Sequence, residues 1–109
     1  MVCAVTAEFI SSEGKRDQLI ALLGEMVPET RKKEGAISIE ICIDQDNLNR
    51  IVILERWNSR ADHEAYVAYR KERGDIDIIA KLLATPPKFI WLDFLITGSL
   101  NGQNHFKIT

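Results

Sequence analysis

Residues 36–43 read AISIEICI, and this stretch decides the fold of the chain. Isoleucine occupies every second position, with small or polar residues between. Side chains in a β-strand point alternately to the two faces of a sheet, so a period of two indicates a strand. The pattern predicts a strand over 36–43 with Ile37, Ile39, Ile41 and Ile43 on one face and Glu40 on the other.

The strand at 36–43 has a hairpin partner. The polar stretch 44–47 (DQDN) is typical of a turn, and residues 50–57 (RIVILERW) then return as a second strand. Residues 2–10 and 88–97 are rich in β-branched and aromatic side chains, which favour strands. We therefore expect four strands.

Helical segments separate the strands. A helix is expected from about Lys15 to a C-terminal cap at Gly35, and Pro28 should kink it or break its last turn. Ser59 is a predicted N-cap of a second helix, which ends near Gly74. A short helix follows over 76–83. The apolar stripe of the first helix comprises Leu19, Leu22, Leu23, Met26 and Val27.

The element order, strand-helix-strand-strand-helix-strand, is that of the ferredoxin-like split βαβ fold, an α+β class with a four-stranded antiparallel sheet. Right-handed crossovers place both helical units on one face of this sheet. Residues 2–10 and 88–97 nevertheless carry apolar side chains at both parities. Either the second face packs against another copy, giving a homodimer, or the chain is a monomer with scattered exposed hydrophobic residues. We expect the homodimer.

Composition narrows the class of protein. The 109 residues fit one domain, expected over 1–97 and followed by a polar tail at 98–109, which is either disordered or reaches a partner subunit. A formal net charge of −2 argues against nucleic-acid binding. No apolar run is long enough to span a membrane, and the first residues do not resemble a signal peptide, so a cytoplasmic protein is expected.

The sequence predicts neither a metal site nor a disulfide bond. His63 and His105 lack partners at ligand spacing, so no metal site is predicted. Cys3 and Cys42 lie on strands that a third strand should separate, which prevents a disulfide bond. Both are expected to be small core residues.

A polar constellation remains near the end of the 50–57 strand. Glu55 shares the parity of Ile51 and Ile53, so a carboxyl group interrupts an apolar face. This carboxyl either pairs with a nearby arginine, lies at the rim of the sheet, or belongs to a site. On the next helix, His63, Tyr66 and Arg70 fall on one face, which either borders a pocket or forms an exposed stripe.

These residues carry a resemblance to a known family. The segment Glu55-Arg-Trp57-x-Ser59 resembles the Glu-x-Trp-x-Ser segment of the antibiotic biosynthesis monooxygenase domain, which includes quinol-monooxygenase-like proteins. The similarity extends upstream through 12–15 (SEGK) and 30–35 (TRKKEG). Downstream it continues through 66–74 (YVAYRKERG) and 86–87 (PP), and it covers roughly residues 3–95.

The resemblance implies a ferredoxin-like unit paired into a dimeric α/β barrel. It also implies oxygenation of a quinol-like or phenolic small molecule by dioxygen, without flavin, haem or metal. In this chemistry a base removes a phenolic proton, and the electron-rich anion reduces dioxygen directly. Many members have histidine nine residues after the motif tryptophan, where this chain has Tyr66. That departure also argues against the haem degradation of related proteins.

The resemblance therefore implies roles for the residues of this chain, with one difference at the position of the family's histidine. His63, one turn earlier, is the predicted base, and Tyr66 is expected to hydrogen-bond the substrate oxygen. Arg70 would favour an anionic substrate. Two other functions remain open: an isomerase or similar acid–base enzyme, and a non-catalytic binding protein. The predicted substrate-contacting residues are Trp57 as the aromatic wall, Glu55, Tyr69, Arg70 and Phe9.

Overall fold

The computed structural model of the protein describes residues 2–98 and the backbone of residues 107–108. The four main strands form one antiparallel sheet in the order β2-β3-β1-β4. This arrangement confirms the predicted α+β ferredoxin-like fold. The elements, in chain order, are β1 (Cys3–Ile10), α1 (Arg16–Thr30), β2 (Ala36–Ile43), β3 (Arg50–Trp57), α2 (Arg60–Glu72), α3 (Asp75–Ala80), β4 (Lys88–Asp93), β5 (Ile96–Thr97) and β6 (Lys107–Ile108).

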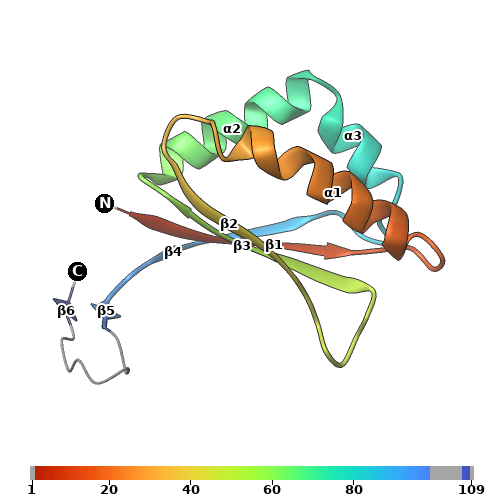
Figure 1. Ribbon diagram of the computed structural model, residues 1–109, viewed down its shortest axis with the longest axis horizontal. Helices are drawn as coiled ribbons and strands as arrows, with labels where there is room; N and C mark the ends of the chain where they lie inside the picture. Colours follow the sequence, from red (N-terminus) through yellow and green to blue (C-terminus); the bar gives the residue numbers. More distant parts are fainter. Residues whose placement is uncertain (1, 99–106, 109) are drawn as a thin grey trace.

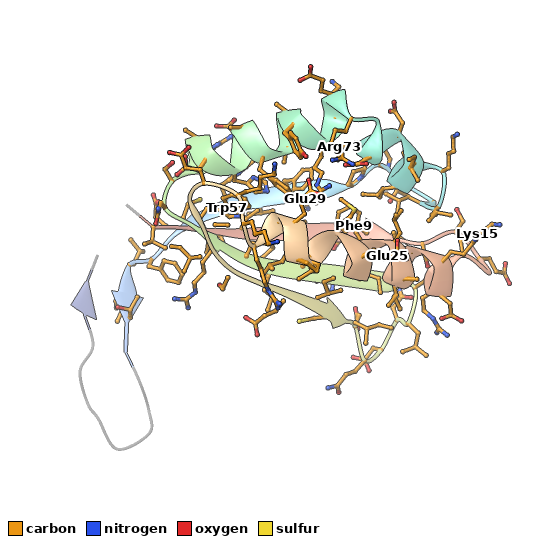
Figure 2. All side chains as sticks on the ribbon, turned by 45° about the horizontal axis from the view of Figure 1, so that its top comes forward. Phe9, Lys15, Glu25, Glu29, Trp57 and Arg73 are labelled. Carbon is orange, nitrogen blue, oxygen red and sulfur yellow. The ribbon has the colours of Figure 1, made fainter. Side chains whose placement is uncertain are left out.

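Helices α1, α2 and α3 cover the same face of the sheet, as right-handed crossovers require (Figure 1). None of the helices in the described part of the chain is both long and apolar enough to cross a membrane. Under the helices, alternate residues of the two central strands are buried, and Phe9 and Trp57 lie between the sheet and the helices (Figure 2). The inward-facing residues of β1 and β3 are Cys3, Val5, Ala7 and Phe9, and Ile51, Ile53, Glu55 and Trp57.

The opposite face of the sheet carries a patch of exposed apolar side chains beside charged residues such as Glu8 and Arg56. Leu54 on β3 and Ile90 on β4 flank Thr6 of the central strand β1, and both are more than 40% exposed. Leu92, also more than 40% exposed, lies beside Ala4. In Figure 1 no helix of the described chain covers this side. An exposed apolar patch of this kind is typical of an interaction surface.

Strand β2 departs from the predicted four-isoleucine stripe. Only Ile39 and Ile41 pack against the core, whereas Ile37 and Ile43 are exposed. The pairing of β2 with β3 shifts between Ala36 and Ser38, so Ala36 lies opposite Trp57 and the intervening Ile37 falls out of alternation. Ile43 ends the strand at the edge of the sheet. The period of two therefore predicted the strand but not its register.

Several predicted boundaries were wrong. Helix α1 ends at Thr30, two residues after Pro28, and residues 31–35 form turns rather than a last helical stretch to Gly35. The expected strand 88–97 divides into β4 and β5, and β5 pairs with β6 instead of the main sheet.

Of the two cysteines, only Cys3 is buried, because Cys42 faces the exposed side of the sheet. Most of the predicted tail 98–109, including His105, lies outside the described residues.

The predicted cap of α2 is confirmed, since the Asp62 backbone N–H donates to the Ser59 hydroxyl at 3.1 Å. The same Asp62 side chain packs against Gly35, whose φ of +83° is a left-handed conformation. A Cβ on Gly35 would overlap the Cβ, Cγ and Oδ2 atoms of Asp62. Glycine is therefore needed at 35 for both its backbone conformation and its lack of a side chain.

We expect Gly35→Ala to lower the free energy of unfolding by about 2–3 kcal/mol, because it adds a steric overlap to left-handed backbone strain. Gly74→Ala is the matched control: its φ is +85°, but no atom lies within 4 Å of its virtual Cβ. The control should lose only about 1 kcal/mol. Urea unfolding measures both, and equal losses would contradict the role of Asp62.

Candidate active site

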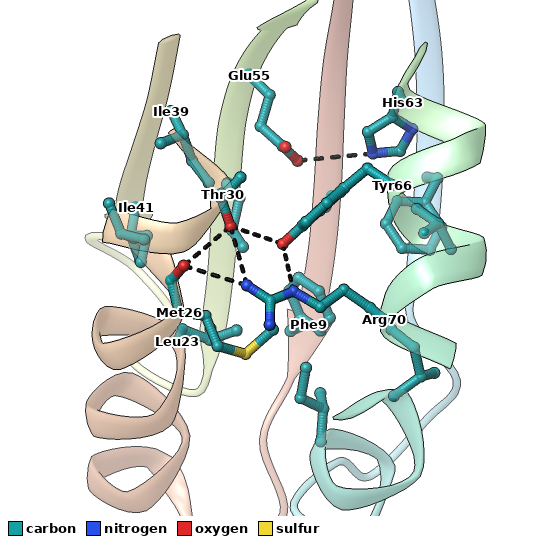
Figure 3. A pocket seen from close by; sticks show the side chains of 17 residues that line it. Phe9, Leu23, Met26, Thr30, Ile39, Ile41, Glu55, His63, Tyr66 and Arg70 are labelled. Atoms are coloured by element: carbon teal, nitrogen blue, oxygen red, sulfur yellow. Dashed lines mark hydrogen bonds and ion pairs between the residues drawn. The ribbon is translucent and has the colours of Figure 1, made fainter. Parts of the chain in front are cut away.

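A small cavity lies between the helices and the covered face of the sheet (Figure 3). Its volume is about 50 Å³, and apolar side chains form most of its wall. Ionisable side chains enter it only from β3 and α2 within the described residues. The lining residues are Ala7, Phe9, Leu23, Met26, Val27, Thr30, Ile39, Ile41, Ile53, Glu55, His63, Tyr66, Val67, Arg70, Ile76, Ile79 and Phe89.

Glu55 is the buried carboxyl group of this cavity. The strand alternation that buries Ile51 and Ile53 also turns Glu55 inward, and only 5% of the residue is exposed. The Trp57 indole N–H donates to its Oε1 at 3.1 Å. Burial raises the pKa of Glu55 to about 7, although the Trp57 hydrogen bond partly opposes this effect. Because no arginine or lysine pairs with Glu55 among the described residues, the carboxyl group exchanges a proton near neutral pH.

His63 lies opposite Glu55, in the first turns of α2. It is 1% exposed, and burial lowers its pKa to about 4, so the imidazole is neutral at pH 7. The Trp91 indole N–H donates to Nδ1 at 3.0 Å. An indole nitrogen only donates, so Nδ1 carries the lone pair and the proton of the neutral ring is on Nε2. Nε2 lies 3.9 Å from Glu55 Oε2, which is beyond hydrogen-bond range, so this edge of the ring faces the carboxyl group without bonding to it.

A second polar cluster closes the other side of the cavity. Arg70, 3% exposed, donates from Nε to the Tyr66 hydroxyl at 3.0 Å and from Nη1 to Asp75 at 2.9 Å. The Thr30 hydroxyl donates to the Met26 carbonyl, so the Tyr66 hydroxyl donates to Thr30 at 2.7 Å. The cluster joins α1, α2 and the start of α3. It also pairs the positive charge of Arg70 with Asp75 instead of leaving it free for a ligand.

The structure brings most of the predicted site residues together. Phe9, Glu55, His63, Tyr66 and Arg70 all line the cavity. The alternatives of an arginine partner for Glu55 and an exposed stripe on α2 therefore do not apply.

Two predicted contacts lie elsewhere. Trp57 is not part of the cavity wall: it is buried behind it, stacked on Tyr66 with ring centroids 5.2 Å apart, and holds Glu55 through its N–H. Tyr69 points away from the cavity, where its hydroxyl donates to Glu29 and the Lys33 ammonium lies over its ring.

The sequence interpretation missed Trp91, Thr30 and Asp75. Trp91 shares the parity of Phe89 on β4, which was a signal that it faces the helices. Thr30 and Asp75 gave no signal, because their roles depend on how the end of α1 meets α2 and α3. Among the described residues, no group of three or more His, Cys, Asp or Glu side chains could hold a metal ion.

Comparison with known proteins identifies the family. The sequence profile described as "Antibiotic biosynthesis monooxygenase" matches residues 2–70, which include β1 to β3 and most of α2. The chain belongs to the antibiotic biosynthesis monooxygenase family. The match contains Glu55, His63, Tyr66 and Arg70, whereas Trp91 lies beyond it. No curated protein matches this chain.

Solved structures share the fold of this chain. Rv0793 from Mycobacterium tuberculosis is 28% identical, with a TM-score of 0.72 over 91% of this chain and 100% of that protein. A conserved protein from Methanosarcina mazei Go1 has a TM-score of 0.77 at 16% identity, over 84% of this chain and 91% of that one. A putative antibiotic biosynthesis monooxygenase from Deinococcus radiodurans has a TM-score of 0.75 at 19% identity, over 95% and 100%. The last two similarities establish the fold alone.

The shifted pKa values of Glu55 and His63 affect stability in opposite directions. Glu55 keeps its proton to about pH 7 when folded and to its ordinary 4.5 when unfolded, so stability falls as pH rises through this range. His63 binds a proton below its ordinary 6.5 when unfolded and below about 4 when folded, so stability falls as pH drops from 6.5 to 4. Between pH 4.5 and 6.5 the two groups change the free energy of unfolding with pH at equal and opposite rates, so their pH dependences cancel.

Single variants should expose each contribution. Relative to wild type, Glu55→Gln is expected to gain about 2–3 kcal/mol of unfolding free energy as pH rises from 4.5 to 6.5, and His63→Asn to lose a similar amount. Other titrating groups, such as Asp44, contribute equally to all three proteins and drop out of the differences. Urea unfolding at stepped pH measures these differences, and three parallel curves would contradict the assigned pKa values.

Proposed function

We propose that this chain is a cofactor-independent monooxygenase that oxidises a small quinol-like or phenolic aromatic molecule with dioxygen. In the balanced reaction, a quinol and O₂ give a hydroxyquinone and water. One oxygen atom enters the ring and the other leaves as water, with the quinol supplying all four electrons. Family membership supports this class of reaction, and the geometry of the cavity supports the roles given below.

The observation that carries the proposal is the buried carboxyl group of Glu55, which has no arginine or lysine partner among residues 2–98. A phenol ionises near pH 10, so an ordinary carboxylate is a weak base for it. Burial raises the pKa of Glu55 from 4.5 to about 7. This change makes Glu55 a stronger base by about 3 kcal/mol, while a useful fraction stays ionised at neutral pH. Glu55 accepts the phenolic proton, and the resulting phenolate transfers electrons to O₂.

We therefore assign the role of base to Glu55. The sequence alone had indicated His63 for this role. The nitrogen of His63 that would accept a proton is occupied by the Trp91 N–H, and burial lowers the pKa of the ring to about 4. The Nε2–H of His63 instead donates toward Glu55 or the phenolate oxygen. Tyr66 and Arg70 form one side of the cavity. Their polar atoms already bond to each other and to Thr30 and Asp75, so we assign them a structural role.

The cavity wall suits a reactive aromatic intermediate. Phe9, Phe89 and the aliphatic residues of α1 give the space beside Glu55 an apolar wall, and a ring that fills this space would shield an oxygenated intermediate from water. The volume of about 50 Å³ is well below that of usual ligand pockets. A ring can enter only by displacing side chains, of which Met26 is the most adaptable. This limit favours a single-ring substrate.

An isomerase is the second candidate. A carboxyl group with a pKa near 7 in an apolar cavity also suits proton abstraction beside a carbonyl group, which consumes no oxygen. Consumption of O₂ separates the two reactions, and substrate binding without turnover would indicate a binding protein instead.

We expect wild-type protein to accelerate O₂ uptake by a simple 1,4-benzenediol, with a rate that rises with pH around 7 as Glu55 ionises. Glu55→Gln should lower kcat/KM by about 10²–10⁴-fold, since it removes the base. Glu72→Gln, on the exposed side of α2, is the matched control and should match wild type. An oxygen electrode measures uptake after subtraction of the protein-free rate. Equal uptake by Glu55→Gln and wild type would refute the role of Glu55.

We also propose that the exposed face of the sheet joins two copies of the chain into a homodimer. Val2, Leu54, Ile90 and Leu92 are each 41–46% exposed, and the register places three of them around β1. Covering these side chains would contribute on the order of several kcal/mol. A pairing of sheets face to face gives the dimeric α/β barrel that the resemblance implies.

Replacing Leu54 and Leu92 together by glutamate should produce a monomer, because it places charges in the centre of the proposed interface. Ile78→Glu is the control: Ile78 is 50% exposed but lies on α3, away from this face. Light scattering at micromolar concentration measures the mass. A monomeric wild-type protein would refute the dimer.

A further inference from the structure

Trp91 contacts the site although it lies outside the segment that matches the family. It lies on β4, beyond residues 2–70, and reaches the back of the His63 ring. Its N–H donates to Nδ1 at 3.0 Å, and its ring centroid lies 5.9 Å from that of the imidazole. The Arg60 guanidinium lies 4.0 Å from the centroid of the indole ring, and Phe89 packs beside it. The indole is thus held in place on more than one side.

We propose that Trp91 is a positioning residue that holds His63 in the one tautomer whose Nε2–H faces Glu55. The proposal rests on the proposed role of Glu55, although the tautomer itself can be observed without any substrate. Neutral imidazole has two tautomers of similar energy in water, so a fixed donor at one nitrogen selects the proton position at the other.

The selected tautomer decides which state of Glu55 is favoured. With the proton on Nε2, the positive end of the N–H dipole lies toward Glu55 Oε2 across 3.9 Å, which favours the carboxylate electrostatically. With the proton on Nδ1, a lone pair would face the same oxygen, and the protonated carboxyl group would be favoured. Trp91 therefore acts on the proton affinity of Glu55 through His63, without contact with the substrate.

The remaining groups around the pair do not duplicate this effect. Trp57 donates to Glu55 Oε1, the other carboxyl oxygen, and has no hydrogen bond to His63 among those of the described residues. Tyr66 and Arg70 line the cavity from α2, but their polar atoms bond to Thr30, Asp75 and each other. The other cavity residues from α1, α3 and the strands carry no ionisable side chain, and Thr30 is the polar one.

Two phenylalanine variants separate the contributions of the two indoles. Trp91→Phe removes the donor to His63 and keeps an aromatic ring, whereas Trp57→Phe removes the donor to Glu55 and leaves Trp91 intact. Long-range ¹H–¹⁵N spectra of the imidazole report the tautomer, and ¹³C spectra of the carboxyl groups report the titration of Glu55.

Wild type should show His63 protonated on Nε2. In Trp91→Phe the Nδ1–H tautomer should appear, and the Glu55 titration should move upward by about one pH unit. In Trp57→Phe the titration should also move upward, while the His63 tautomer stays as in wild type. The pH at which O₂ uptake reaches half its maximum should follow the Glu55 titration in each protein.

An unchanged His63 tautomer in Trp91→Phe would overturn the proposal. If that variant does not fold, benzothienylalanine at position 91, which keeps the indole shape with sulfur in place of N–H, tests the same point. A tautomer that responds to Trp91 in a protein without quinol-dependent O₂ uptake would refute the proposed function alone. Glu55-dependent uptake with a tautomer indifferent to Trp91 would refute the positioning role alone.

Discussion

One constraint governs the site: a carboxyl group is buried beneath the helices, and no arginine or lysine in the described part of the chain pairs with it. Glu55 is turned inward by strand alternation, and the nearest basic side chain that titrates, His63, is kept neutral by its own burial. Arg70 lines the same cavity but is bound to Asp75, Tyr66 and Thr30. If Arg70 reached Glu55 instead, the pKa of the carboxyl group would fall and its basicity would be lost.

The arginine cluster has a structural role as well. Arg70 is 3% exposed, so its positive charge is buried. A buried charge is stable only when it is paired and hydrogen-bonded, and Arg70 meets this requirement with groups from α1, α2 and α3. It thereby fixes the three helices relative to one another above the sheet. The ends of the helices that form the roof of the cavity are consequently set by polar contacts, and its walls by apolar packing.

Patterning in the sequence was sufficient for the fold and for part of the site. A period of two located β2 and placed Glu55 on the covered face, and helical spacing placed His63, Tyr66 and Arg70 on one side of α2. Patterning could not give the bulge that displaces Ile37, because a bulge depends on pairing with β3. Nor could it give the direction of the His63 proton, which depends on an indole from a strand 28 residues later.

The placement of the two indoles has an optical consequence. The chain contains two tryptophans, and each donates its N–H to one member of the Glu55–His63 pair. Protonation or displacement of either partner changes the surroundings of an indole directly. When tryptophan is excited selectively over the two tyrosines, the emission therefore comes from indoles that contact this pair, and it provides a label-free fluorescent reporter of ligand entry and proton exchange there.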